Sequence, residues 1–250
     1  MTVKLMTNER PLLDRTSLGS LEMWLESART DGAIALIDKE EHWTSFDCVA
    51  KLRGLTKVKR VGHAGTLDPL ATGLLVICFG KATKDIALLQ DVDKVYHVQI
   101  LLGASSTTDD GAGEITVVQN VQQHSDAEIL AALLCFTGLI DQTPPAYSAV
   151  KHQGKRQYDL ARQGKDFTPK VRQVTVHAID KINIQWPIVS CTIHCSKGTY
   201  IRSIARDLGE KLGCGGYITQ LRRSASGNNS VDNALHVSDV QLALAEMASV

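Results

Sequence analysis

The chain has 250 residues, of which 44% are hydrophobic, and it carries 27 basic and 27 acidic side chains. This length predicts one large domain, or a domain with a small insertion, and the apolar content is sufficient for a sizeable core. We find no apolar run long enough to span a bilayer and no continuous apolar stretch of the kind found in secretory signals, so we expect a cytoplasmic protein that does not enter a membrane.

The six cysteines favour neither disulfides nor a metal site. They form no Cys-x-x-Cys pair, and no histidine stands at a matching spacing. Cys191 and Cys195 alternate with Val189 and Ile193, which predicts a buried strand face. We therefore expect reduced thiols and no bound metal.

Residues 1–31 are predicted to be an N-terminal extension to a domain that we assign to residues 32–250. Four apolar residues at helical spacing indicate a short amphipathic helix that can dock on the domain, namely Leu18, Leu21, Leu25 and Ala28.

The first half of the domain is predicted to hold three strands and three helices. A buried strand is expected over residues 33–37, and a helix capped by Thr44 or Ser45 should run to about Leu52. The next segments are predicted as a strand over 73–79, a helix over 82–89, a strand over 95–102 and a helix over 127–136. Ser125 and Glu128 form the capping box of the last helix.

Pro144-Pro145 interrupts the pattern, and the polar stretch that follows is expected to hold one short helix within residues 151–170. The remaining segments are predicted as strands over 174–186 and 189–195, a helix over 200–212 closed by Gly213, a tight loop at 214–216, a strand over 221–225 and a helix over 237–247. Because these elements do not repeat as βαβ units, we expect an α+β fold with a mixed or antiparallel central sheet flanked by helices and loops.

Two basic runs stand out although the formal net charge is zero. The first contains five cations and no acid, namely Lys51, Arg53, Lys57, Lys59 and Arg60. The second belongs to a basic arm near residues 144–172. Charge runs are usually solvated faces, but the first leads directly into the glycine-rich segment 62–74, which favours a surface that binds phosphates.

That segment, Gly-His-Ala-Gly-Thr-Leu-Asp-Pro-Leu-Ala-Thr-Gly-Leu, places Asp68 directly before a proline. A residue before proline is driven to extended geometry, and the flanking glycines permit close backbone approach. Such a loop can hold one carboxylate over a cleft. The structural alternative is an Asp-Pro turn whose carboxylate caps the next segment.

Further polar or aromatic residues stand at junctions between predicted elements. Tyr96 lies in a strand, where packing is the usual role. Tyr200 and Arg202 lie where a strand leads into a helix, and Arg202 can either keep a carboxylate ionised or form a surface ion pair of little value. Leu221 precedes Arg222-Arg223, which we interpret as one apolar contact and two phosphate binders.

Together these segments resemble the TruB-type tRNA pseudouridine synthases. The similar segments are, in the family's order, residues 62–74, 93–96, 144–151, 194–203, 207–215 and 221–223. The resemblance spans about residues 32–223 and implies the pseudouridine synthase fold. It also implies isomerisation of a uridine in the T-loop of tRNA, at position 55, to pseudouridine by base flipping and attack of an aspartate.

The resemblance implies a role for each matching residue. Asp68 corresponds to the catalytic nucleophile, Tyr96 to the tyrosine that stacks on the flipped uracil, and Tyr200 to a tyrosine that removes the C5 proton or packs the base. Arg202 corresponds to the arginine that pairs with the catalytic carboxylate. The other implied substrate-binding residues are His63, Leu221, Asp110 and Lys151.

The resemblance implies tRNA, through its T-arm, as the partner. It implies no cofactor, no metal and no obligate protein partner. Two departures from the family pattern are visible. Residues 38–45 lack the proline and glycine of the family's Asp-Lys-Pro-x-Gly motif. Only 29 residues follow Leu221 (250 − 221), which is too few for an independently stable unit, so we expect no PUA domain.

Three other functions compete with this interpretation. A tRNA-binding and folding chaperone without turnover would not need Asp68, Tyr96, Tyr200 and Arg202 together. The guide-dependent box H/ACA branch shares the catalytic core but depends on a PUA domain and protein partners. A carboxylate hydrolase would need a second acidic group, and no motif supplies one.

Overall fold

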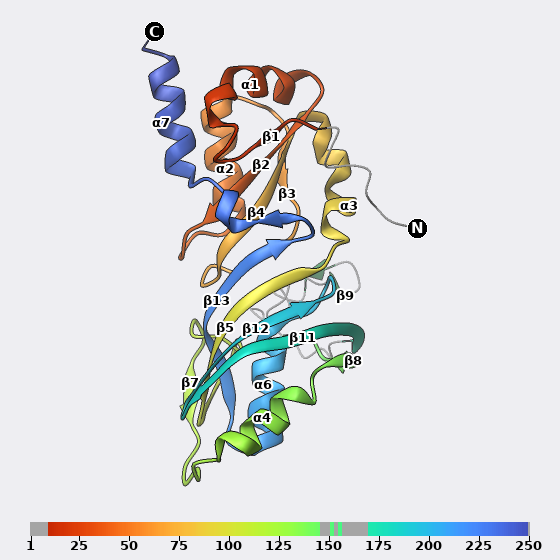
Figure 1. The fold of residues 1–250 in the computed structure, drawn as a ribbon, viewed down its shortest axis with the longest axis vertical. Coiled ribbons are helices and arrows are strands. Elements are labelled where there is room, and N and C mark those ends of the chain that lie inside the picture. The colour runs from red at the N-terminus through yellow and green to blue at the C-terminus, as the bar shows by residue number, and fades with distance from the viewer. Residues whose placement is uncertain (1–9, 146–150, 153–154, 157–169, 250) are drawn as a thin grey trace. The chain divides into compact units, whose positions relative to one another are not determined.

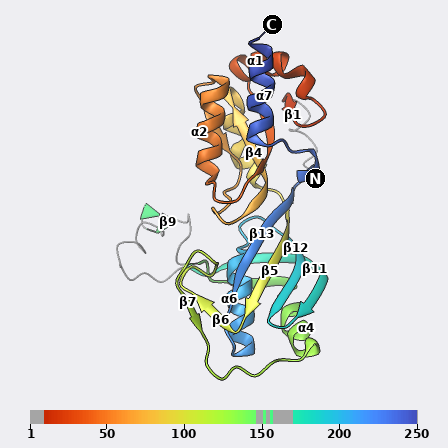
Figure 2. The same cartoon turned by 90° about the vertical axis from the view of Figure 1, so that its left-hand side faces the viewer.

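The computed structural model describes residues 10–145, 151–152, 155–156 and 170–249. The chain divides into two compact units, shown in Figures 1 and 2. Unit 1 comprises Met1–Lys94 and Arg222–Val250, and unit 2 comprises Val95–Leu221. Strand β13, Gly216–Ser226, therefore contributes its first six residues to unit 2 and its remainder to unit 1.

Unit 1 is a mixed sheet covered by helices. Its strands are β1 (Leu12–Leu13), β2 (Ala33–Lys39), β3 (Val61–His63), β4 (Thr72–Phe79), the end of β13 and β14 (Asn229–Ser230). Its helices are α1 (Leu21–Thr30), α2 (Ser45–Thr56), α3 (Ile86–Gln90) and α7 (Val237–Met247), with 3₁₀ turns at Leu18–Ser20, Gly80–Asp85 and Val231–Asn233. Strand β2 is parallel to β1 and antiparallel to β4, and β4 is parallel to β13.

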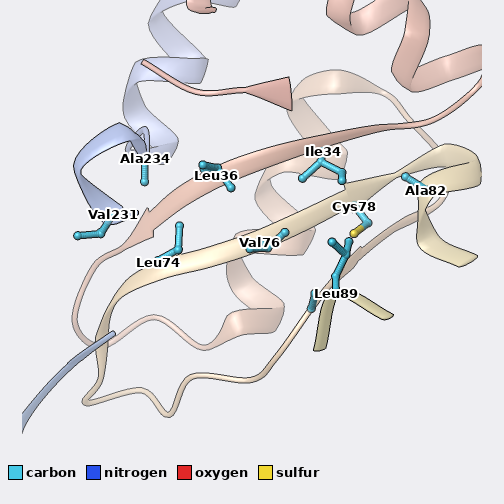
Figure 3. Close-up of a cluster of buried hydrophobic side chains, with 10 residues drawn as sticks. Ile34, Leu36, Leu74, Val76, Cys78, Ala82, Leu89, Val231 and Ala234 are labelled. Carbon is cyan, nitrogen blue, oxygen red and sulfur yellow. The ribbon is translucent and has the colours of Figure 1, made fainter. Parts of the chain in front are cut away.

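The core of unit 1 explains why polar and apolar residues do not alternate along β2. All seven of its residues are buried, and successive strand residues point to opposite faces, so both faces of β2 are covered. Ten buried residues from β2, β4 and the segments around them form one cluster, which is drawn in Figure 3. Helix α7 contacts both β2 and α2.

The N-terminal segment is docked on this sheet, as its amphipathic helix predicted. Leu12 pairs with Ile34 across β1 and β2. The indole of Trp24, on α1, donates to the carbonyl of Ile34 at 3.0 Å and meets the ring of Phe79 edge-on at 4.9 Å.

Unit 2 is built on the strand order β13-β5-β12-β11-β8. The strands that join β13 in this sheet are β5 (Lys94–Leu102), β8 (Gly138–Gln142), β11 (Arg172–Gln185) and β12 (Ile188–Cys195). Two separate two-stranded sheets consist of β6 (Ala104–Ser106) with β7 (Ile115–Val117), and of β9 (Lys151–His152) with β10 (Lys155–Arg156). Strand β11 is antiparallel to both of its neighbours. The helices are α4 (Asp126–Leu134) and α6 (Ile201–Leu212), which contact each other.

Helix α6 buries one stripe of side chains. Ile201, Ile204, Ala205 and Leu208 are at most 3% exposed, and their i, i+3, i+4, i+7 spacing places them on one face. Gly213 closes the helix in the left-handed conformation, at φ 70°.

Most of the predicted elements are confirmed, and the α+β class with a mixed sheet is confirmed as well. The strand expected over 221–225 begins five residues earlier, at Gly216, and two other segments differ. The helix expected over 82–89 begins as a 3₁₀ turn at Gly80 that lacks a side-chain cap. The tight loop expected at 214–216 ends earlier, because Gly216 already starts β13; a Cβ there would lie 2.6 Å from the carbonyl oxygen of Ala205.

Residues 151–170 lie largely outside the described part, so the short helix expected there stays a prediction. The described pieces of this stretch, β9 and β10, pair antiparallel. None of the helices in the described ranges is long and apolar enough to cross a bilayer.

The cysteines are free thiols, and all but Cys135 are buried. Val189, Cys191, Ile193 and Cys195 are all buried along β12, as their alternation predicted. Burial raises the pKa of Cys48 to about 11 and the pKa values of Cys78 and Cys191 to about 12.

Candidate active site

Asp68 lies in unit 1, in the loop between β3 and β4, and is half-buried. The residue before it is fixed from both sides. Ser45, the first residue of α2, donates its hydroxyl to the Leu67 carbonyl at 3.0 Å and accepts from the Leu67 amide at 2.8 Å. After Asp68, the Pro69 carbonyl accepts from the His42 amide at 2.8 Å. These bonds hold the backbone on both sides of Asp68 in place.

Lys39 also binds the backbone of this loop, at the Pro69 carbonyl. Its side chain is fully buried, and its amine donates to the carbonyls of Trp43 at 2.6 Å, Glu40 at 2.9 Å and Pro69 at 3.4 Å. Burial lowers the pKa of Lys39, and electrostatic interactions with Cys48 and Asp68 oppose that shift. Sequence reasoning quoted Lys39 within the Asp-Lys motif but assigned it no role. Its burial could not be read from that motif.

Arg222 and Arg223 both bind groups of unit 1 itself. Arg222 forms a two-pronged ion pair with Asp38, at 3.0 and 2.6 Å. Arg223 is 1% exposed and donates to the carbonyls of Leu74 at 2.7 Å and Gly65 at 3.1 Å. The interpretation of Arg223 as a phosphate binder is therefore wrong, because the side chain is enclosed and its donors already bind backbone oxygens.

His63 ends β3 at the entrance to the loop and is half-buried. Burial lowers the pKa of His63, the positive charge of Arg223 lowers it further, and a backbone contact at Gly65 opposes both. The imidazole is therefore neutral near neutral pH.

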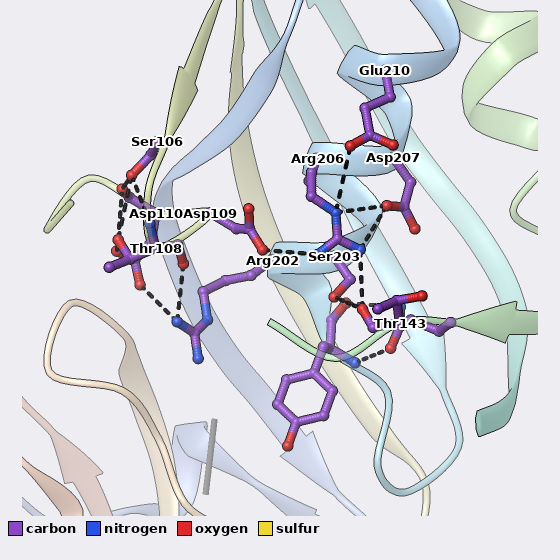
Figure 4. Close-up of polar contacts among 12 residues, drawn as sticks. Ser106, Thr108, Asp109, Asp110, Thr143, Arg202, Ser203, Arg206, Asp207 and Glu210 are labelled. Atoms are coloured by element: carbon purple, nitrogen blue, oxygen red, sulfur yellow. Dashed lines mark hydrogen bonds and ion pairs between the residues drawn. The ribbon is translucent and has the colours of Figure 1, made fainter. Parts of the chain in front are cut away.

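In unit 2, Asp110 and Arg202 are brought together and are both buried (Figure 4). Arg202 Nη1 donates to Asp110 Oδ2 at 3.3 Å and to the Thr108 carbonyl at 3.1 Å. The other oxygen of Asp110 accepts from the Thr108 hydroxyl at 2.5 Å and from the Ala112 amide at 3.1 Å. Asp110 therefore orients the Arg202 guanidinium. The pairing of Arg202 with Asp68 stays a prediction.

One turn further along α6, Arg206 anchors the same loop (Figure 4). It donates to Asp109 Oδ2 at 3.0 Å, to Asp207 Oδ1 at 2.9 Å and to the Thr143 carbonyl at 3.0 Å. Burial raises the pKa of Asp109 against the attraction of Arg206. Burial alone would lower the pKa of Arg206, but Asp109 and Asp207 together raise it. Sequence reasoning missed Asp109 and Arg206; their only signal was the proximity in sequence to Asp110 and Arg202.

Tyr200 is the N-cap residue of α6 and is half-buried. Its amide donates to Gln142 Oε1 at 2.7 Å, and its carbonyl accepts from Gln142 Nε2 at 3.0 Å. The Arg172 guanidinium lies 5.8 Å from the ring centroid, within the range of a cation–π contact. Gln142 is a further residue that sequence reasoning missed, since it lies 58 positions before Tyr200 in the chain.

The remaining candidates lie on strands of unit 2. Tyr96 is half-buried on β5, and Leu221 is 8% exposed on β13. Lys151 belongs to β9, and its side chain lies outside the described residues.

Comparison with known proteins identifies the family. Residues 53–201 match the sequence model of the TruB family pseudouridylate synthase N-terminal domain, and residues 202–249 match that of the tRNA pseudouridylate synthase B C-terminal domain. The chain is 44% identical over 209 residues to a tRNA pseudouridine synthase B of Cupriavidus metallidurans, covering 83% of this chain and 66% of the relative. It is 46% identical over 215 residues to a tRNA pseudouridine synthase B of Chloroherpeton thalassium, covering 84% of this chain and 89% of that relative.

Among solved structures, the chain is similar to one in the crystal structure of a Cbf5-Nop10-Gar1 complex. The TM-score is 0.62 at 27% identity, over 81% of this chain and 51% of that one. Two family models that together cover most of the chain, and relatives above 40% identity, give one answer: the chain belongs to the TruB family of tRNA pseudouridine synthases.

Proposed function

We propose that this chain converts a uridine in the T-loop of tRNA, at position 55, to pseudouridine, with Asp68 as the nucleophile. The observation that carries the proposal is the Asp68 loop itself. It offers one half-buried carboxylate on a backbone that Ser45 and His42 hold on either side. A fixed carboxylate of this kind is suited to covalent catalysis.

The chemistry requires no net oxidation or reduction. The bond between C1′ of the ribose and N1 of uracil breaks, a bond between C1′ and C5 forms, C5 loses a proton and N1 gains one. An ionised Asp68 can supply the transient covalent bond, to the base or to the sugar carbon, and leaves unchanged at the end. The proposal therefore includes no cofactor and no metal.

The uracil must leave its stack before Asp68 can reach it, at a cost of a few kcal/mol. Stacking on an aromatic side chain offsets this by about 1–3 kcal/mol per base. In the proposal, Tyr96 supplies the stacking surface, Tyr200 removes the C5 proton or packs the base, and Leu221 contributes an apolar contact. Gln142 supports this role because it fixes the backbone of Tyr200 on both its amide and its carbonyl.

Arg202 is proposed to keep Asp68 ionised, since a guanidinium stays charged at any working pH. Asp110 then acts as a positioning residue for Arg202. His63, neutral near pH 7, and Lys151 are proposed to contact the nucleotides around the flipped uridine. We further propose that the chain acts in the cytoplasm on the T-arm without an obligate protein partner.

The test is to incubate the purified chain with an unmodified T-arm transcript and to map pseudouridine by carbodiimide treatment and primer extension. We expect product at the T-loop uridine, and Asp68→Ala should reduce the rate by more than about 1,000-fold. Asp68→Asn is the matched control for packing, because it keeps the shape of the side chain without the charge. Tight transcript binding by a folded wild-type chain that makes no product would instead support the chaperone alternative.

A further inference from the structure

Arg223 is a charged side chain buried in unit 1 whose hydrogen bonds go to backbone carbonyls. It forms no ion pair with a carboxylate anywhere in the described ranges. Burying a guanidinium without a carboxylate is costly, and an apolar side chain of similar length would avoid that cost. The position therefore uses the donors of arginine for something that packing alone does not supply.

Its two acceptors show what that is. The Gly65 carbonyl lies three residues before Asp68, and the Leu74 carbonyl lies six residues after it. One rigid, planar group thus joins the start of the Asp68 loop, at Gly65, to strand β4, which follows the loop. A guanidinium suits this task because its donors form a fixed fork.

Two glycines make room for this arrangement. At Gly65, with φ +101°, a Cβ would lie 3.4 Å from Arg223 Nη1. At Gly73, with φ +100°, a Cβ would lie 2.3 Å from the Arg223 carbonyl oxygen. Arg223 pairs directly with Gly73 across β13 and β4, so the backbone at Arg223 sits against the exit of the loop while its side chain reaches back to the entrance.

We propose that Arg223 is a positioning residue for the isomerisation: it fixes the Asp68 loop through the Gly65 and Leu74 carbonyls and so determines where the carboxylate stands. This inference rests on the proposed function. It predicts an effect on the chemical step rather than on RNA binding, because the enclosed side chain is not available to RNA.

The experiment measures kcat and KM for the T-arm transcript, per folded molecule, in Arg223→Met and Arg223→Lys. Arg223→Met keeps the length and loses both donors. We expect kcat to fall by about 10- to 100-fold, the size of effect caused by a misplacement of about 1 Å, with KM within about threefold of wild type. Arg223→Lys keeps the charge but not the fork, and should retain an intermediate kcat.

Ile34→Ala is the matched control for lost stability. Ile34 is a buried core residue that pairs with Cys78, at the end of β2 remote from the Lys39–Gly73 pair. It should lower the melting temperature of the chain while leaving kcat per folded molecule unchanged. If Arg223→Met does not fold, the kcat per folded molecule of Arg223→Lys is compared with that of Ile34→Ala, and a lower kcat in Arg223→Lys alone supports the positioning role.

The proposal is overturned if Arg223→Met keeps the wild-type kcat, if only KM changes, or if Ile34→Ala lowers kcat to the same extent. A wild-type chain that makes no pseudouridine would refute the proposed function instead, so the two failures are distinguishable.

Discussion

The two units use buried and half-buried cations in different ways. In unit 1, Lys39 and Arg223 donate to backbone carbonyls around Asp68. In unit 2, Arg202 donates to the Asp110 carboxylate, and Arg206 donates to those of Asp109 and Asp207. Each arginine also binds one backbone carbonyl, that of Thr108 or of Thr143. A cation bound to carbonyls fixes the path of the main chain, whereas a cation bound to a carboxylate fixes the direction of two side chains. Binding to carbonyls suits the loop that holds Asp68 in place. Binding to a carboxylate suits Arg202, whose own guanidinium must be oriented.

The largest expected effect on stability comes from breaking the ion pair between Asp110 and Arg202 in unit 2. Asp110→Ala removes a buried acceptor of three hydrogen bonds and should lower the free energy of unfolding by about 3–5 kcal/mol. Chemical denaturation measures this loss. Asp110→Asn, which keeps an acceptor oxygen, should lose less, and equal losses in both variants would contradict the importance of the ion pair.

The next effect tests the backbone of unit 1. Gly73→Ala places a Cβ against the Arg223 carbonyl in a left-handed conformation and should cost about 2–3 kcal/mol. Gly54→Ala is the control, since a Cβ there meets nothing within 4 Å and should stabilise α2 by about 0.5–1 kcal/mol. Thermal unfolding of both variants checks the sign. A Gly73→Ala variant as stable as wild type would show that the loop exit tolerates a side chain.

A smaller effect compares two similar helix starts. Thr44→Ala and Ser125→Ala each remove a capping box and should each cost about 1 kcal/mol. Only in α2 does the residue after the N-cap, Ser45, also bind the Asp68 loop, at the Leu67 carbonyl. Therefore only Thr44→Ala should also reduce turnover per folded molecule. A similar loss of turnover in Ser125→Ala would contradict this distinction.

The smallest expected effect depends on pH. The pKa of His63 is lowered in the folded chain from 6.5, so the stability linked to its neutral form is present above that value and is lost as pH falls through the lower, folded pKa. The free energy of unfolding, followed from about pH 7 to about pH 5, should therefore fall less in His63→Gln than in wild type. Parallel curves would exclude His63 as a source of this acid sensitivity.

Local signals predicted the elements well because their causes are local. The capping box at Ser125 and the left-handed Gly213 are encoded within a few residues, and the predicted helix over 237–247 agrees with α7. The motif around Asp68 likewise predicted a loop that leads into the strand over 73–79, but strand β3 before it was not predicted. The TruB resemblance, carried by short segments, was confirmed by the family comparison.

Partnerships across the sequence could not be predicted in the same way. Arg223 and Gly65 are 158 residues apart, and Arg202 and Asp110 are 92 apart. An Arg-Arg pair after a glycine loop has the same local pattern whether it faces RNA or backbone carbonyls. Only the packing of β13 against β4 decides that Arg223 turns inward.

The distribution of thiols gives the chain a chemical handle. Five of its six cysteines are buried, and the raised pKa values of Cys48, Cys78 and Cys191 leave almost no reactive thiolate near neutral pH. Cys135, directly after α4, is exposed. A maleimide dye should therefore attach to the native chain at one defined position, and so report on RNA binding by fluorescence without any engineered substitution.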